Sequence, residues 1–164
     1  MEKESWLKYF PYSKPRDQQV KVINKVLSDF EKDKKYAIIE CGTGVGKSAI
    51  GLTIARYLNN KFKDSEESGC YFLTTQKILQ EQYEKDFINI GMKSLYSSVN
   101  YSCKRKKGSS CKDIQDLIRQ GAEKPQQEKC SFDCIYKKKK EEFCNSDLSI
   151  TNFSYFLTEK NYKI

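Results

Sequence analysis

The sequence contains no histidine, and this absence restricts the chemistry available to the chain. Without imidazole, mixed cysteine–histidine zinc sites are excluded, so a metal site must use thiolates or oxygen ligands. Long apolar runs are also lacking: residues 36–39 are far too short to cross a bilayer, and residues 2–4 are charged where a signal peptide needs apolar side chains. We therefore expect a cytoplasmic or nucleoplasmic protein that is neither secreted nor in contact with a membrane.

The composition otherwise suits one globular domain. Of the 164 residues, 38% are hydrophobic and 32% are charged, which allows one core with little to spare. Seven cysteines have to be explained. Because a reducing compartment disfavours disulfides, metal ligation and inert thiols are the competing interpretations.

The positive charge is concentrated in one segment. Residues 101–140 hold twelve Lys and Arg against five Asp and Glu, a balance of +7 out of the net +8 of the chain. Such a block either attracts a phosphate backbone through counterion release or forms a solvated basic loop. Charge alone favours the two interpretations equally.

Apolar spacing predicts alternating helices and strands. Helical spacing is found at residues 19–30, 47–60 and 76–87. Short apolar runs of strand length are found at residues 36–40, 70–74, 93–99 and 148–151. Strands that alternate with helices build a parallel sheet, so we predict an α/β fold with helices flanking the sheet.

A glycine-rich loop connects the first predicted strand to the helix after it. Its residues are Gly42, Thr43, Gly44, Val45, Gly46, Lys47 and Ser48. The N–H groups of such a loop bind phosphates, Lys47 reaches the β- and γ-phosphates, and the Ser48 hydroxyl completes the Mg²⁺ shell. We predict a nucleotide site here, with Lys47 and Ser48 as its catalytic residues. Cys41 replaces the first glycine of the strict motif, and we interpret it as a tolerated small residue.

Four cysteines lie within the basic segment. They are Cys103, Cys111, Cys130 and Cys134. Two close CxxC pairs would indicate a zinc ribbon, and these are absent. Four thiolates can hold a [4Fe–4S] cluster that stabilises a segment without an apolar core, and unligated thiols are the alternative. Cys70 falls in a predicted strand and is interpreted as core packing, whereas the role of Cys144 stays open.

The ordered motifs resemble those of the XPD/DinG group of iron–sulfur superfamily 2 helicases. The matching segments are 16–19 (the adenine-recognising Q motif), 40–48 (motif I), 74–76 (motif Ia), 100–103 and 134–136 (first and last cluster ligands) and 149–157 (the segment after the cluster). The resemblance implies a partial RecA-like P-loop domain interrupted by a small cysteine-rich insert. It implies an ATP-dependent 5′→3′ DNA helicase that uses ATP, Mg²⁺ and a [4Fe–4S] cluster. It adds Arg16 and Gln19 to the ATP site and favours iron–sulfur over zinc at the cysteines.

The same resemblance implies that single-stranded DNA, or its junction with duplex, is the partner. Phosphate contacts are expected from the basic runs 104–107 and 137–140, which lie next to the cysteines. Tyr101, Phe132 and Tyr136 are available to stack on bases, or else pack around the cluster.

The acidic pair that organises Mg²⁺ and activates water is not found after any buried strand, and a second RecA-like lobe is missing. We therefore expect this chain to be inactive alone, as a fragment, half of a split gene or a remnant. The predicted parts are a first RecA-like section (1–99), the insert (100–140) and a return to the RecA-like domain (141–164). The alternatives are a non-catalytic, metal-stabilised single-strand binding module, or a subunit that completes a helicase or nuclease with a second polypeptide.

Overall fold

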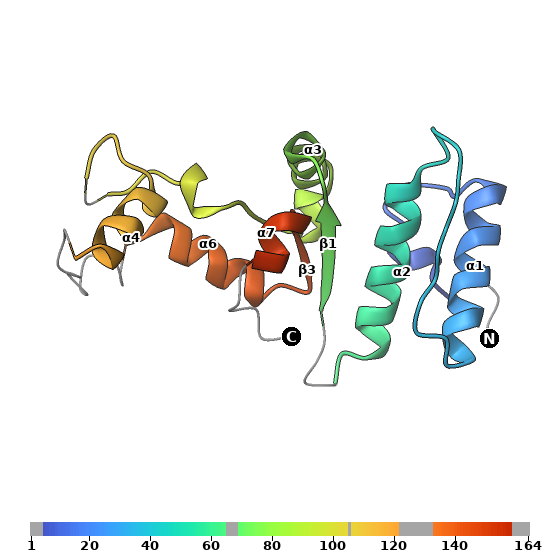
Figure 1. Ribbon diagram of the computed structural model, residues 1–164. Coiled ribbons are helices and arrows are strands. Elements are labelled where there is room, and N and C mark those ends of the chain that lie inside the picture. Colours follow the sequence, from blue (N-terminus) through green and yellow to red (C-terminus); the bar gives the residue numbers. More distant parts are fainter. Residues whose placement is uncertain (1–4, 65–68, 105, 122–132, 159–164) are drawn as a thin grey trace. The chain divides into compact units, whose positions relative to one another are not determined.

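The computed structural model describes residues 5–64, 69–104, 106–121 and 133–158. The chain divides into two compact units, residues 1–68 and 69–164, and each is described by itself. Within the described ranges, all strands belong to the second unit (Figure 1), and no helix is long and apolar enough to cross a membrane.

Two helices form the core of the first unit. They are α1 (Asp17–Glu31) and α2 (Lys47–Lys61), preceded by the short 3-10 helix η1 (Leu7–Tyr9). Ile23 and Leu27 of α1 and Ile50 of α2 belong to one buried apolar cluster. The same cluster contains Trp6, whose indole Nε1 donates to Asn24 Oδ1 at 2.7 Å. Both helices predicted in this region are confirmed, because their apolar spacing does face a core.

The strand predicted at residues 36–40 is wrong. All residues between α1 and α2 are described, and none of them belongs to a strand. The side chain of Ile38 is 100% exposed and that of Tyr36 is 87% exposed, so the apolar run does not enter a core. A strand needs a neighbour to pair its backbone N–H and C=O groups, and the described part of this unit offers none.

The second unit is built on a parallel three-stranded sheet in the order β1-β3-β2. Its strands are β1 (Cys70–Thr74), β2 (Lys93–Leu95) and β3 (Leu148–Asn152). Ile150 of β3 lies between Phe72 of β1 and Ser94 of β2 in the register. The central strand β3 is buried from residue 148 to residue 151, as a strand covered on both faces should be. The three strands predicted in this region are confirmed, the second of them in a shorter form.

Helices connect and flank this sheet. They are α3 (Lys77–Phe87), η2 (Ile88–Ile90), η3 (Ser98–Asn100), α4 (Cys111–Arg119), α6 (Ile135–Cys144) and α7 (Phe153–Thr158). The buried side chain of Gln80 fastens α3 to β2, since its Nε2 donates to Ser94 Oγ and to Leu95 O, both at 2.9 Å. The predicted α/β class is confirmed, and the architecture is that of a partial RecA-like P-loop domain.

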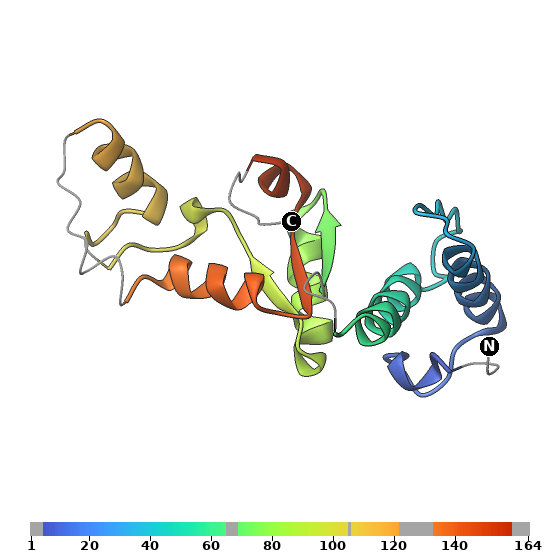
Figure 2. The ribbon, with the colours of Figure 1, turned by 90° about the horizontal axis from the view of Figure 1, so that it is seen from below.

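The segment between β2 and β3 contains α4, a helix that was not predicted. It starts with a capping box, in which Ser110 Oγ accepts from Asp113 N at 3.2 Å and Asp113 Oδ2 accepts from Ser110 N at 2.7 Å. Both views show α4 beyond α6 and away from the sheet (Figures 1 and 2). A small buried cluster includes residues of the sheet and of this segment: Leu95, Cys111, Tyr136 and Phe143. The expectation of a segment without apolar packing is therefore wrong in its described part, whereas its boundaries at 100 and 140 stay a prediction.

Candidate functional site

The glycine-rich loop leads directly into the N-terminus of α2. Gly44 and Gly46 have φ angles of +77° and +83°, in the left-handed region that favours glycine. A Cβ at Gly46 would stand 2.5 Å from Gln19 Nε2. The Gln19 side chain of α1 therefore occupies the space that a side chain at position 46 would need. The first turn of α2 leaves N–H groups without helical partners beside this loop, which is the arrangement that binds anions.

Two residues of the predicted nucleotide site hold carbonyl groups of the loop. Arg16 Nη1 donates to Gly44 O at 2.7 Å, and Gln19 Nε2 donates to Val45 O at 3.0 Å. The two are also joined to each other, because Arg16 N donates to Gln19 Oε1 at 2.9 Å. The structure therefore brings the predicted residues of α1 and of the loop together, although they are far apart in sequence.

Lys47 is folded back on the same loop. Its Nζ donates to Gly42 O at 2.9 Å and to Cys41 O at 3.2 Å. Lys47 and Thr43 are exposed, and Ser48 is half-buried in the first turn of α2. A phosphate group that enters the loop would compete with these carbonyls for the Lys47 ammonium, because a charged oxygen is the stronger acceptor.

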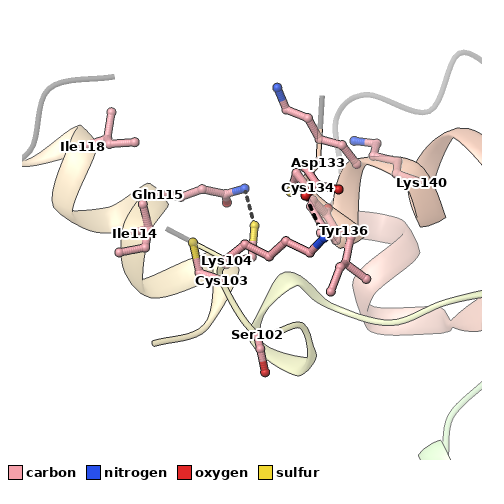
Figure 3. Close-up of a pocket in the computed structure, with 13 residues that line it drawn as sticks. Ser102, Cys103, Lys104, Ile114, Gln115, Ile118, Asp133, Cys134, Tyr136 and Lys140 are labelled. Carbon is pink, nitrogen blue, oxygen red and sulfur yellow. Dashed lines mark hydrogen bonds and ion pairs between the residues drawn. The ribbon is translucent and has the colours of Figure 1, made fainter. Parts of the chain in front are cut away.

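Three of the four predicted metal ligands line one pocket in the second unit. Cys103, Cys111 and Cys134 are among its lining residues, and its volume is about 310 Å³. Figure 3 shows Cys103 and Cys134 beside this pocket. An isolated antiparallel bridge between Ser102 and Ser110 brings the first two cysteines together across a short loop. Most of the seven residues between the two cysteines form the loop that this bridge closes.

The thiols of this pocket do not form a closed metal site among the described residues. No group of three or more cysteine, aspartate or glutamate side chains in the described ranges is close enough to hold a metal ion. The Cys111 sulfur accepts from Gln115 Nε2 at 3.5 Å. Cys130, the fourth predicted ligand, lies outside the described residues.

Cys70 and Cys144, which belong to the same unit, do not line that pocket. Cys70 is half-buried in β1, and burial raises the pKa of its thiol, which suits the predicted packing role. Cys144 ends α6 and is exposed.

Lysines beside the pocket have a carboxylate partner that sequence analysis missed. Asp133 pairs with Lys104 at 2.8 Å and with Lys138 at 3.7 Å. The hydrogen bond from Lys104 is the main reason that the pKa of Asp133 lies below its usual range. The signal in the sequence was a single acid directly before Cys134 and a run of lysines. Lys139 is likewise paired, with Glu142 at 3.0 Å.

The aromatic residues of this region pack against one another. The rings of Tyr101 and Tyr136 lie with their centroids 5.5 Å apart, and the hydroxyls of Tyr136 and Tyr155 are hydrogen-bonded. Tyr136 is buried and Tyr101 half-buried, which favours packing over base stacking for these two rings. Phe132 lies outside the described residues.

A second pocket lies at the carboxyl ends of the strands and was not predicted. Its volume is about 370 Å³, and its polar lining includes Lys77, Asn100 and Asn152. Lys77 Nζ donates to Asn100 Oδ1 at 3.0 Å, and Asn152 Nδ2 donates to Thr75 O at 3.1 Å. In open parallel sheets, ligands bind at the carboxyl ends of the strands. The residues that follow the predicted strands could therefore have indicated this site.

Comparison with known proteins identifies a family. The model of the family described as type III restriction enzyme, res subunit, matches residues 12–158, a range that includes the phosphate loop and the cysteine segment. Neither the curated proteins nor the solved structures contain a match.

Proposed function

Because this chain belongs to the family of type III restriction enzyme res subunits and carries a superfamily 2 helicase-like domain, we propose that it is the ATP-binding portion of a 5′→3′ DNA helicase. One observation carries the proposal: a glycine-rich loop at the start of α2 with Arg16, Gln19 and Lys47 on its carbonyls. Such a loop presents N–H groups and a lysine to a triphosphate.

In this proposal each residue of the loop has a distinct task. The N–H groups of Gly44, Val45 and Gly46 bind phosphate oxygens, and Lys47 leaves its loop carbonyls to neutralise the β- and γ-phosphates. The Ser48 hydroxyl, at the start of α2, would hold Mg²⁺, which spreads the phosphate charge when bound. Water activation needs carboxylates that the motifs of this sequence do not provide. A second polypeptide or another part of the protein would supply them.

We also propose that Cys103, Cys111, Cys130 and Cys134 hold a [4Fe–4S] cluster. Support comes from the pocket, which three of these residues line together with mostly apolar side chains and lysines and one carboxylate, Asp133. That lining suits a thiolate cluster, which carries negative charge. When bound, the cluster would fasten α4 and α6 to each other.

Single-stranded DNA, or its junction with duplex, is the proposed partner. The basic runs beside the cysteine pocket supply positive charge, and the pocket at the strand ends supplies Lys77, Asn100 and Asn152. These groups contact phosphates without reading sequence. The alternative is a metal-stabilised module that binds single strands and ignores ATP; it is favoured if zinc without sulfide is found in protein purified without oxygen.

Substitution of the loop lysine tests the main proposal. Lys47→Ala should weaken Mg²⁺–ATP binding at least about tenfold, since the variant loses a charge-assisted contact to phosphate. Isothermal titration of the full chain measures this loss. Lys35→Ala, an exposed lysine before the loop, is the control and should bind ATP as the wild type does. Wild-type affinity in Lys47→Ala would reject the nucleotide site.

A further inference from the structure

A pair of tyrosines joins the two pockets of the second unit. Tyr136 of α6 lines the cysteine pocket, and Tyr155 of α7 lines the strand-end pocket, which lies at the carboxyl ends of the strands. Their hydroxyl groups are hydrogen-bonded to each other. Tyr136 is 7% exposed, so its ring is closely packed and cannot turn without moving its neighbours. A shift of α6 at the cysteine pocket therefore displaces a hydrogen-bond partner of Tyr155.

Tyr101 forms a second connection between the same pockets. Its ring packs against that of Tyr136 with the centroids 5.5 Å apart, and its carbonyl accepts from Cys111 N at 2.7 Å. The Tyr101 hydroxyl, in turn, accepts from Tyr96 N at 3.1 Å. Tyr96 and Asn100, the residue before Tyr101, line the strand-end pocket. Tyr101 is therefore bonded to residues of both pockets.

Two of the proposed cluster ligands belong to the elements that make these contacts. Cys134 is the N-cap residue of α6, just before Tyr136, and Cys111 starts α4. In both views α6 extends from the side of α4 to the sheet (Figures 1 and 2). Figure 3 shows Tyr136 close to Cys134 at the cysteine pocket. A ligand bound to both thiols would fix the first turn of α6 and, with it, the ring of Tyr136.

We propose that the cysteine pocket and the strand-end pocket are coupled through Tyr136, Tyr155 and Tyr101, so that occupied thiols strengthen the binding of single-stranded DNA at the strand-end pocket. The inference rests on the proposed cluster and the proposed DNA partner, and it adds a dependence of one on the other. With the thiols occupied, α6 and Tyr136 are ordered before DNA arrives, so less order has to be created when DNA binds. The negative charge of a thiolate cluster acts in the opposite direction, because it repels phosphates. Tighter binding with the cluster therefore measures the contribution of the tyrosine contacts.

The affinity for a fluorescently labelled oligothymidylate tests the coupling. Anisotropy is recorded with the full chain purified without oxygen, before and after a chelator removes the iron. The wild type should bind about tenfold more tightly with iron than without it, a typical coupling between two sites. Tyr136→Phe and Tyr155→Phe each remove one hydroxyl of the same hydrogen bond, so each should reduce this ratio to about twofold while the iron content is retained, and the double variant should lose no more than either single one.

Tyr83→Phe is the matched control. Tyr83 of α3 belongs to the same unit and lines neither pocket, so loss of its hydroxyl should leave the ratio unchanged. Wild-type ratios in Tyr136→Phe and Tyr155→Phe would overturn the role of the tyrosines. Equal affinities with and without iron in the wild type would overturn the coupling itself.

Nuclear magnetic resonance of the iron-free chain separates these failures from failure of the proposed function. Saturation with oligothymidylate should shift the ring resonances of Tyr136, which does not line the strand-end pocket, and Tyr155→Phe should abolish this shift although DNA still binds. DNA binding without a shift at Tyr136 would overturn the inference. A chain that binds no DNA would reject the proposed partner and the inference together. A chain that binds DNA but no iron would reject the proposed cluster, and the resonances of Tyr136 would then decide the coupling.

Discussion

The phosphate loop and the cysteine pocket are held in different ways. Four carbonyls in or next to the loop accept hydrogen bonds from side chains at the starts of two helices: Arg16 and Gln19 at the start of α1, and Lys47 at the start of α2. The cysteine pocket has a backbone bridge and a small apolar cluster, and its described thiols do not gather into a metal-binding group. Hydrogen bonds from side chains of the protein thus hold the phosphate loop. In the cysteine pocket, a bound ligand would add interactions to the thiols.

The local sequence explains this difference. The loop is attached to α2, which packs with α1 and the buried Trp6 in one apolar cluster. The wall of the cysteine pocket contains lysines, and charged side chains add little packing. The proposed [4Fe–4S] cluster would add covalent cross-links to the apolar contact that Cys111 of α4 already shares with Tyr136 of α6.

The largest effect is expected from removal of one thiol. Cys111 is buried at the start of α4, so Cys111→Ser should lose the cluster, with iron falling from about four atoms per chain to nearly none. Iron and sulfide analysis of protein purified without oxygen measures this. Unfolding of the first unit, followed by fluorescence of the only tryptophan, Trp6, should stay unchanged. If Cys111→Ser destabilised both units equally, the cluster would not stabilise the second unit alone, and the proposed difference between the two sites would be wrong.

Cys144→Ser is the matched control for this substitution. Cys144 belongs to the same unit but is exposed at the end of α6. It should keep the full iron content. Retention of iron in Cys111→Ser would instead reject the proposed ligand set, and loss of iron in Cys144→Ser would add Cys144 to it.

A smaller effect is expected from the core under the phosphate loop. Ile50 is 1% exposed, and Ile50→Ala should lower the free energy of unfolding of the first unit by about 2–5 kcal/mol, because a cavity remains. Urea unfolding followed by Trp6 fluorescence measures the loss, and the iron content should not change. Ile38→Ala removes a side chain that is 100% exposed and should change stability by less than about 0.5 kcal/mol. Equal losses in both variants would contradict the assigned core.

Sequence reasoning succeeded where one local pattern determines the structure. Apolar spacing predicted α1 and α2 because each buries one face, and the run at 148–151 became the central strand β3. It also predicted α3, although that helix buries Gln80 and Phe87 and leaves Leu79 exposed. The same reasoning failed at 36–40, because an apolar run shows that a strand is favourable but not that a neighbour is available. Ile38 shows the outcome, since it is fully exposed.

The candidate sites were predictable in their residues but not in their contacts. The loop motif identified Lys47 and Ser48, and the resemblance added Arg16 and Gln19. No spacing rule showed that Gln19 would bind a loop carbonyl instead of presenting its amide. The capping box of α4 at residues 110–113 and the helical spacing of Ile114, Leu117 and Ile118 were both visible in the sequence, so this helix could have been predicted.

The smallest effect concerns the lysines beside the cysteine pocket. Asp133→Asn removes the carboxylate that pairs with Lys104 and Lys138, so both become available to phosphates. The slope of log K against log salt for single-stranded DNA should become steeper by about 0.7 for each lysine that gains a phosphate contact. Fluorescence anisotropy at several salt concentrations measures it. Asp86→Asn makes the same charge change at an exposed acid of α3, and it should leave the slope nearly unchanged.

The pH dependence of this difference follows from the pKa of Asp133. The hydrogen bond from Lys104 lowers that pKa. The carboxylate is therefore ionised, and its ion pairs are present, at every pH above the ordinary pKa of an aspartate. The difference between wild type and Asp133→Asn should therefore be constant from about pH 5 to pH 8, and it should disappear only below about pH 4, as Asp133 is protonated. A difference that shrinks with rising pH would contradict the pairing. Equal slopes for Asp133→Asn and Asp86→Asn would show that net charge, and not release of the two lysines, sets the salt dependence of DNA binding.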